Sequence, residues 1–278
     1  MTHLTRLRAG LAATRAVVAR ELTAVVRSRS YWLLTAGVGV VVASVAAAGS
    51  GVDTGYVPTV VDLLVPTELL VPAVAFAVGY RVIADDDRRG TLTVLETYPV
   101  PPSAYVLGVY LGRLVAVLAA VSLPLTAVGG YVAASAGPAS PVFATHGGVD
   151  NPALYGRFLG TTALLAAAAL AVALAASAVS GSRRRALVAG LLGLVAVVAG
   201  GDLGLLAAVD AGVVGSDTLS SVLAASPTSA YRGLVFETVV AVAVERSPGT
   251  VAVGPAVAGL VGWISLGLLV ATIAVSRR

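Results

Sequence analysis

Long apolar runs alternate with short polar segments along the whole chain, and six of the runs are long enough for a membrane-spanning helix. A helix needs about 20 predominantly apolar residues to cross the hydrocarbon layer of a bilayer. The pattern therefore predicts an all-α integral membrane protein with one six-helix transmembrane domain over residues 31–278. The expected helices cover 31–49, 57–83, 104–136, 158–179, 186–209 and 251–275.

Residues 1–30 precede the first apolar run and form a basic, amphipathic segment. Val18 and Leu22 fall on one side of a helix and Arg20, Glu21 and Arg27 on the other, which suits a helix in the headgroup layer. Two interpretations are open: a basic tail beside the membrane, or an elbow helix that braces a cytoplasmic partner. The segment contains no apolar stretch of the length found in cleavable signal peptides, so we expect none.

The distribution of arginine predicts the orientation. With the N-terminus in the cytoplasm, fifteen of the 18 basic residues fall at the cytoplasmic side, in agreement with the positive-inside rule. We expect a multi-pass protein of the plasma membrane with both termini in the cytoplasm. A seventh crossing at 228–244 would move Arg277 and Arg278 outside, so 227–246 is expected to be re-entrant or surface-lying. The other three arginines, Arg157, Arg232 and Arg246, are expected in external loops.

Composition narrows the function classes. Hydrophobic residues make up 58% of the chain and charged residues 12%, which is outside the range of soluble domains. The net charge is +4, but the basic residues lie in small groups at the ends of apolar runs, so we expect no nucleic-acid partner. Every basic residue is Arg, and the absence of Lys removes the phosphate-binding residue of a Walker A loop. With no Cys, two His and one Met, neither a metal site nor another cofactor is expected in this chain.

Three carboxylates lie inside the expected spans. Asp62 and Glu68 belong to the second span, which contains three prolines and is expected to be bent or partly unwound, and Asp202 lies in the distal part of the fifth. Carboxylates are costly in a membrane and mark a functional position or a specific partner. They could make structural hydrogen bonds, or serve an ion-coupled secondary transporter. An intramembrane enzyme is disfavoured because neither His lies in a span.

The segment between the second and third spans combines a charge cluster, a short amphipathic helix and a proline-rich turn. The acidic and basic residues are followed by Gly90, and 91–97 places Leu92 and Leu95 on one side of a helix. Prolines then end the helix, and Ser103 can cap the next one. We expect 85–103 to be a cytoplasmic loop that contacts a partner.

This segment resembles the region between the second and third helices of ABC-2 type transporter permeases. Two other stretches, RELTAVVRSRSYWLL and SPTSAYRGLV, resemble the family's elbow and the segment before its last helix. The chain departs from the family pattern in having Asp85–Asp87 where Glu is frequent and Pro101-Pro102 where a charge is frequent. The matching positions are Gly90, Thr91, Leu92, Leu95, Pro99, Val100, Leu107, Gly108, Gly112 and Arg113.

The resemblance implies a division of labour. A separate cytoplasmic ABC ATPase would bind ATP and Mg²⁺, and this chain, as a dimer with itself or a related permease, would form an export path in the lipid bilayer. A scaffold that binds the ATPase and transports nothing is the alternative. The residues implied in ATPase docking are Asp85, Asp86, Asp87, Arg88, Arg89, Gly90, Thr91, Leu92, Leu95 and Pro99.

The walls of the bundle suit a lipid-like, amphipathic or peptide cargo more than a small ion. Chain length and simple loops also resemble the permeases associated with nitrous-oxide-reductase maturation, although the scarcity of soft ligands argues against direct passage of copper.

Overall fold

The computed structural model describes residues 3–97, 100–135, 150–211, 223–244 and 252–278, and this part of the chain is helical, with no strand. Six helical stretches are long and apolar enough to span a membrane, which confirms the expected number. They are Arg29–Ala48, Tyr56–Arg88, Pro102–Ser135, Pro152–Ala178, Arg183–Ala208 and Val253–Ser276.

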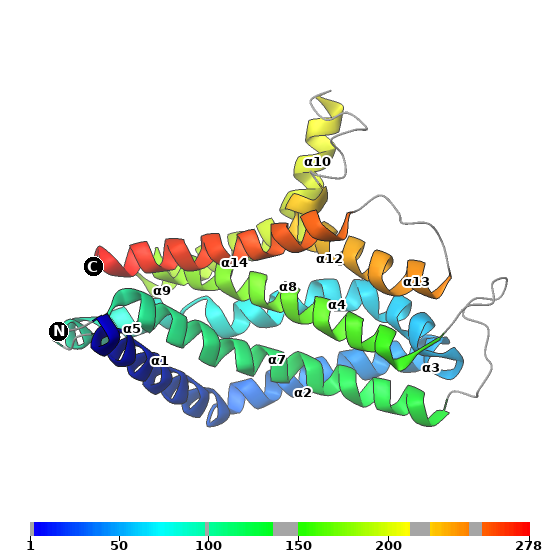
Figure 1. Ribbon diagram of the computed structural model, residues 1–278, viewed down its shortest axis with the longest axis horizontal. Coiled ribbons are helices and arrows are strands. Elements are labelled where there is room, and N and C mark those ends of the chain that lie inside the picture. Colours follow the sequence, from blue (N-terminus) through cyan, green and yellow to red (C-terminus); the bar gives the residue numbers. More distant parts are fainter. Residues whose placement is uncertain (1–2, 98–99, 136–149, 212–222, 245–251) are drawn as a thin grey trace.

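The helices are bundled lengthwise around α8 (Pro152–Ala178), as Figure 1 shows. Next to it lie α4 (Tyr56–Gly79), α7 (Pro102–Ser135) and α14 (Val253–Ser276), and α2 (Arg29–Ala48) packs against α4 and α7. α8 is rich in Ala, and these small side chains let its neighbours approach closely. A Cβ atom on Gly267 of α14, for example, would lie 2.7 Å from the backbone of Ala171.

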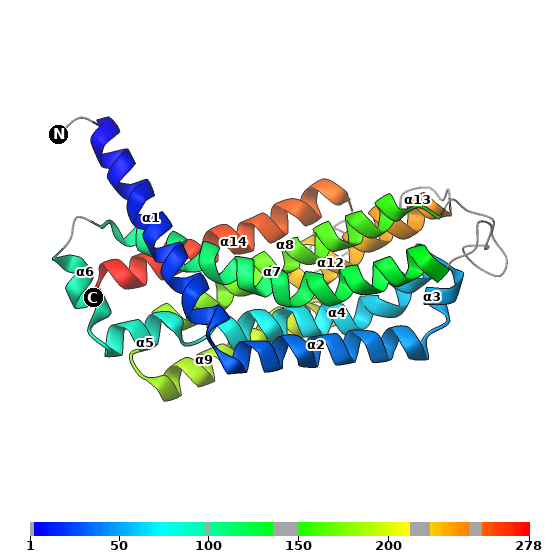
Figure 2. The same cartoon turned by 90° about the horizontal axis from the view of Figure 1, so that it is seen from below.

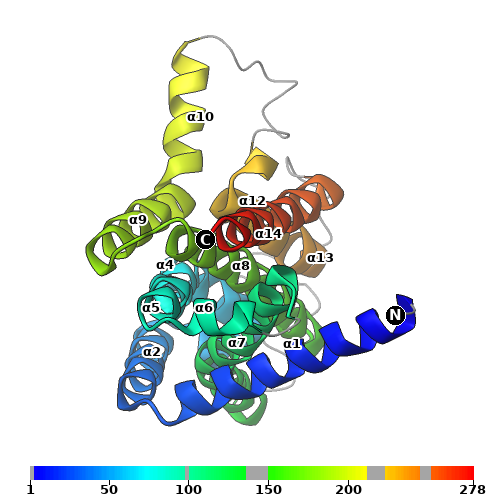
Figure 3. The same cartoon turned by 90° about the vertical axis from the view of Figure 1, so that its left-hand side faces the viewer.

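Both chain termini lie at one end of the bundle, together with α5 (Val82–Arg88) and α6 (Thr91–Glu96) (Figure 2). We call this the α6 end. The opposite end carries α3 (Gly51–Thr54) and α13 (Ala241–Ala243), and we call it the α3 end. Seen along the bundle, α6 lies across the α6 end in front of α7 and α8 (Figure 3).

Helix α1 (His3–Val26) crosses α7 at a steep angle and then points away from the bundle (Figure 2). Two glycines of α7 make this crossing possible. A Cβ atom on Gly108 would lie 2.6 Å from Cβ of Val17, and one on Gly112 would lie 2.6 Å from Cβ of Glu21. The spacing of these glycines thus gives the Leu-Gly-x-x-x-Gly-Arg stretch a physical role, which is to seat α1.

Two spans differ from the expected shape. α4 remains helical through Pro66 and Pro72, so the alternative of partial unwinding there is wrong, and the alternative of a bend stays a prediction. The fifth span is not one regular helix, because α9 (Arg183–Val195) passes through a π-helix, η1 (Ala196–Gly200), into α10 (Gly201–Asp210). α10 then turns away from the bundle (Figures 1 and 3).

The change of direction in the fifth span coincides with close packing against the segment that precedes α12. A Cβ atom on Gly201 would lie 2.1 Å from Oγ of Ser226, and Oγ1 of Thr228 donates to the carbonyl of Val198 within η1 at 3.3 Å. These contacts occupy the inner side of the span at the π-helix, so tertiary packing accounts for the break.

The segment before the last span forms α12 (Pro227–Val235), the π-helix η2 (Phe236–Val240) and α13. Within α12 every residue is buried except Arg232. α12 is therefore packed within the bundle, and whether 227–246 is re-entrant or lies on the membrane surface stays a prediction; residues 245–246 lie outside the described part.

The α1–α7 crossing gives a first prediction. Replacing Gly112 with Val forces the new side chain against Glu21 and the carbonyl of Val18, and overpacking of this kind costs about 1–3 kcal/mol. We expect a lower thermal unfolding midpoint for the purified variant in detergent. Gly130→Val on the same helix is the matched control, because a Cβ atom there meets nothing within 4 Å. Equal losses of stability in the two variants would contradict the packing assigned to Gly112.

Candidate functional site: two ion-pair clusters at different depths

The chain leaves the second span through α5 and reaches α6 by a sharp turn at Gly90. Gly90 has a φ of 72°, in the left-handed region that side chains disfavour, and its N–H donates to the carbonyl of Asp87. After α6, the carbonyl of Pro101 accepts from the N–H of Ala104 in the first turn of α7. The expected short helix is present, and the glycine and prolines bound it.

The three aspartates of α5 each meet a different part of the chain. Asp86 accepts from Arg20 of α1 at 2.6 Å and from the hydroxyl of Tyr105 in α7 at 2.8 Å. Asp87 pairs with Arg278 after α14 at 2.5 Å. Asp85 pairs with Arg81 and Arg88, both within four residues of it. Asp86 and Asp87, which we expect to contact an ATPase, thus also join α5 to other parts of this chain.

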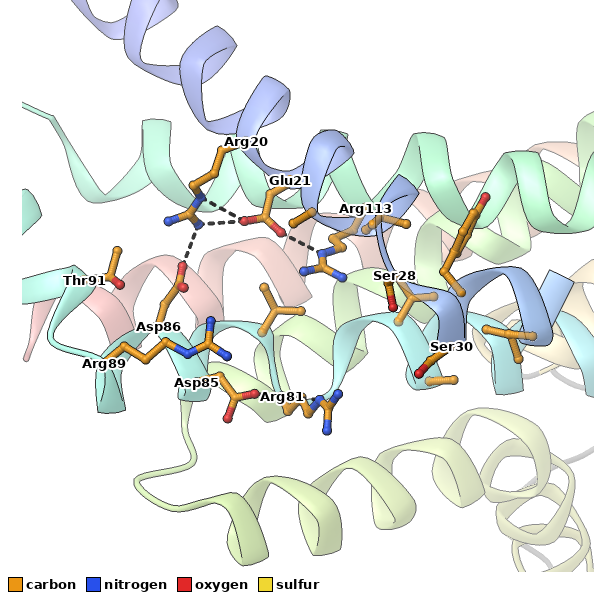
Figure 4. Close-up of a pocket in the computed structure, with 17 residues that line it drawn as sticks. Arg20, Glu21, Ser28, Ser30, Arg81, Asp85, Asp86, Arg89, Thr91 and Arg113 are labelled. Carbon is orange, nitrogen blue, oxygen red and sulfur yellow. Dashed lines mark hydrogen bonds and ion pairs between the residues drawn. The ribbon is translucent and has the colours of Figure 1, made fainter.

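Glu21 is the central carboxylate of this cluster. It is buried, and it pairs with Arg20 and with Arg113 of α7, each at 2.7 Å (Figure 4). Burial alone would lower the pKa of Arg20, but attraction by Asp86 and Glu21 outweighs it and raises that pKa, so the guanidinium stays charged. The cluster therefore locks α1 to α5 and α7.

A cavity of 610 Å³ opens beside these pairs, between α1, α2, α4, α5 and α7. Its wall combines charged groups with apolar ones such as Val25 and Leu34 (Figure 4). The cavity therefore offers both charged and apolar contacts to a ligand.

On α6, the structure differs from the expectation for Leu92. Its side chain is 7% exposed and packs into this chain's own core, so it does not offer itself to a partner. Val94, on the same helix, is 58% exposed. The side chain of Leu95 and all of Pro99 lie outside the described part, and their role in docking stays a prediction.

Asp62, in the first half of α4, has a structural partner. One of its carboxylate oxygens accepts from the N–H of Gly51 at 3.0 Å and so anchors the start of α3. Asp150 makes a comparable contact that the sequence did not signal, because it accepts from the N–H groups of Tyr56 and Val57, at 2.7 and 3.0 Å, at the start of α4. Both carboxylates therefore accept hydrogen bonds from backbone N–H groups at helix starts and stabilise the turns at the α3 end.

Glu68 and Asp202 come together through Arg232. The expectation of a loop was wrong for Arg232, which lies in α12, and for Arg157, which lies in α8 because that helix begins at Pro152. Glu68 is buried in the middle of α4, and its two oxygens accept from Nε and Nη2 of Arg232 at 3.1 and 2.5 Å. The same Nη2 lies 3.6 Å from Oδ2 of Asp202 at the start of α10. The Arg232 and Asp202 side chains are 44% and 38% exposed, so the cluster reaches the surface of the bundle.

Hydroxyl groups surround this second cluster. Oγ of Ser229 donates to Oδ1 of Asp202, and the buried hydroxyl of Tyr231 meets Oγ1 of Thr67 at 2.9 Å and Oγ1 of Thr162 at 3.2 Å. α12 is thereby tied to α4, α8 and α10 by polar contacts as well as by packing. The sequence signal for this cluster is Arg232, a single Arg in the apolar stretch 227–244, because a charge in such a stretch needs a partner.

Comparison with known proteins gives the family. The family model described as "ABC-2 family transporter protein" matches residues 15–278. The probable ABC transporter permease protein NosY of Pseudomonas aeruginosa is 30% identical over 168 residues, which cover 58% of this chain and 58% of that protein. The similarity to this relative thus spans less than two thirds of its length.

The Glu68–Arg232 pair generates a second prediction. Arg232→Gln leaves Glu68 buried without its cation, and we expect the purified protein to lose about 1–3 kcal/mol of stability. This is less than the roughly 3–5 kcal/mol of a fully buried pair because Arg232 is half-exposed. Adding Glu68→Gln removes the unpaired charge and should restore most of the loss, as read from thermal unfolding.

Arg157→Gln serves as the control for this pair, because Arg157 donates to the Thr238 carbonyl at 2.9 Å on the exposed side of the bundle. A double variant no more stable than Arg232→Gln alone would show that the ion pair does not hold α12 against α4.

Proposed function

The chain belongs to the ABC-2 family of transporter proteins, and we propose that it is the membrane-spanning permease subunit of an ABC transporter, driven by a separate cytoplasmic ATPase. The subunit itself carries out no ATP hydrolysis, and ATP and Mg²⁺ are bound by the partner. The relative NosY is named a probable ABC transporter permease protein, which agrees with this role.

The observation that carries the proposal is the position of α6. This short helix lies across the end of the bundle where both termini are found, and it connects the second and third spans directly (Figures 1 and 3). Val94 is exposed on α6, and Arg88 and Arg89, which precede α6, are exposed and charged. A short helix with an apolar contact and flanking charges is suited to a groove on a partner protein.

Movement at α6 has a direct route into the bundle. α5 follows α4 after a single turn, and the Ser177 hydroxyl of α8 accepts from the N–H groups of Ile83 and Ala84 at 3.0 and 3.2 Å. A displacement of α6 by closure of the ATPase would therefore be passed to α4 and to the helices tied to α5. Coupling in this account is mechanical, by rigid-body tilting of helices.

The arrangement extends to the rest of the complex. We place the α6 end in the cytoplasm of the plasma membrane, take α1 as the elbow helix in the headgroup layer, and regard 223–244 as re-entrant from the α3 end. Two copies, or one copy with a related permease, enclose the path, and the direction is export. An ion-coupled mechanism fits less well, because Glu68 is engaged by Arg232 and is not available as a simple ion site.

A cysteine at Val94 tests the docking surface. The chain has no native Cys, so Val94→Cys in native membranes carries a single crosslinking site, and the captured proteins are identified by mass spectrometry. We expect capture of a nucleotide-binding ATPase. Leu123→Cys is the control, since Leu123 is 61% exposed in the middle of α7, where no cytoplasmic protein reaches. Absence of an ATPase from the Val94→Cys products, with Val94→Cys shown to react with cytoplasmic reagents, would overturn the proposal.

A further inference from the structure

A second cavity at the α6 end is strongly basic. It has a volume of 360 Å³ and lies between α5 and the start of α9. Four guanidinium groups and one carboxylate line it, so its lining carries an excess of three positive charges. The residues are Arg81, Asp85, Arg88, Arg89 and Arg183.

The positive charge in this cavity is not balanced from within the described chain. Asp85 is shared between Arg81 and Arg88 at 3.7 and 3.6 Å, which is much longer than the 2.5–2.7 Å of the closest pairs made by the other carboxylates at this end. Asp86 and Asp87 are engaged elsewhere, and in the described ranges no carboxylate lies within ion-pair distance of Arg89 or Arg183. The cavity therefore presents exposed guanidinium groups that an external anion could pair with.

The start of α9 also favours the binding of an anion, because positive charge is concentrated there. Its first turn contains Arg183, Arg184 and Arg185 and no acidic residue. The N-terminal end of a helix is itself partially positive, so cations in the first turn are unfavourable unless an anion is bound nearby. Guanidinium groups pair with phosphate through two parallel hydrogen bonds, which makes a phosphate group the best match to this lining.

The surface beyond the cavity is apolar. Leu187 and Leu191 follow Arg183 at intervals of four residues, hence on the same face of α9, and both are about half-exposed. α9 is the start of a candidate span, so we expect this exposed apolar face to meet hydrocarbon, one helical turn and more beyond Arg183. A ligand that carries a phosphate above acyl chains matches both parts, whereas free phosphate matches only the upper one.

We propose that the cavity between α5 and α9 binds the phosphate headgroup of an anionic phospholipid, with the acyl chains along Leu187 and Leu191. The site uses the membrane embedding of the chain but not the ATPase, so it can be tested without that partner. The bound lipid neutralises the basic lining and holds the start of the fifth span beside α5.

Native mass spectrometry of the purified full-length chain measures this binding. The chain is titrated with phosphatidylglycerol or with phosphatidylcholine, and we expect preferential binding of phosphatidylglycerol. Arg89→Gln with Arg183→Gln should weaken it by about 25-fold, at about 1 kcal/mol per arginine. The matched control is Arg184→Gln with Arg185→Gln, which removes the same charge from residues that do not line the cavity and should change affinity far less.

Three results would overturn the assignment. Equal affinity for the two lipids would exclude a headgroup site of this charge, and equal losses in the two double variants would leave only a diffuse effect of net charge. Displacement of phosphatidylglycerol by an equimolar amount of inorganic phosphate would identify a free-phosphate site instead. Arg183→Lys, which keeps the charge, should bind more tightly than Arg183→Gln, and failure of this rescue would also count against the site.

Discussion

The ion pair between Glu68 and Arg232 is the contact on which the arrangement of the bundle most depends. A carboxylate in the middle of an apolar helix has to be paired, because hydrocarbon offers no water to solvate it. Its cation comes from α12, 164 positions further along the chain, so the pair requires 223–244 to enter the bundle. Once α12 lies there, Ser226 and Thr228 meet the fifth span, whose helix passes through η1 and leaves the bundle as α10.

The same requirement governs the α6 end. Glu21 is buried between Arg20 and Arg113, and Arg20 also reaches Asp86, so the charges of α1, α5 and α7 satisfy one another. Arg278 extends this network to the last helix through Asp87. α4 and α5 thus connect the cluster at Glu68 with the cluster at Glu21. A displacement of α6 would therefore act on helices that these ion pairs already hold together.

Sequence reasoning succeeded where the signal was local. Hydropathy over about 20 residues predicted the six spans, and the run of Gly90, a short amphipathic stretch and prolines predicted the helix that became α6. The glycines at 108 and 112 were noticed as a motif, but their purpose needed the position of α1, which no local pattern specifies.

Sequence reasoning failed where the partner was distant. Arg232 was counted as a loop charge because the positive-inside rule considers only the ends of spans, and its contact with Glu68 depends on tertiary packing. The face of α6 was also assigned wrongly at Leu92, since amphipathic spacing shows that one face is apolar but not whether it meets the chain's own core or a partner. The contacts of Asp86 with Arg20 and of Asp87 with Arg278 were likewise not visible in the local pattern, and the docking role of these aspartates stays a prediction.

The central claim is that ATP binding by a partner moves this bundle. It is tested by measuring how readily a reagent reaches the cluster of Glu68, Arg232 and Asp202 when either ATP or an ion gradient is supplied. Phe236 is exposed four residues after Arg232, and Phe236→Cys in the otherwise cysteine-free chain reports on that face. The account predicts that its rate of alkylation by a membrane-impermeant maleimide changes when native membrane vesicles receive ATP and vanadate, and that ionophores have no effect. A rate that ignores ATP and follows the ion gradient would contradict the account and favour an ion-coupled transporter.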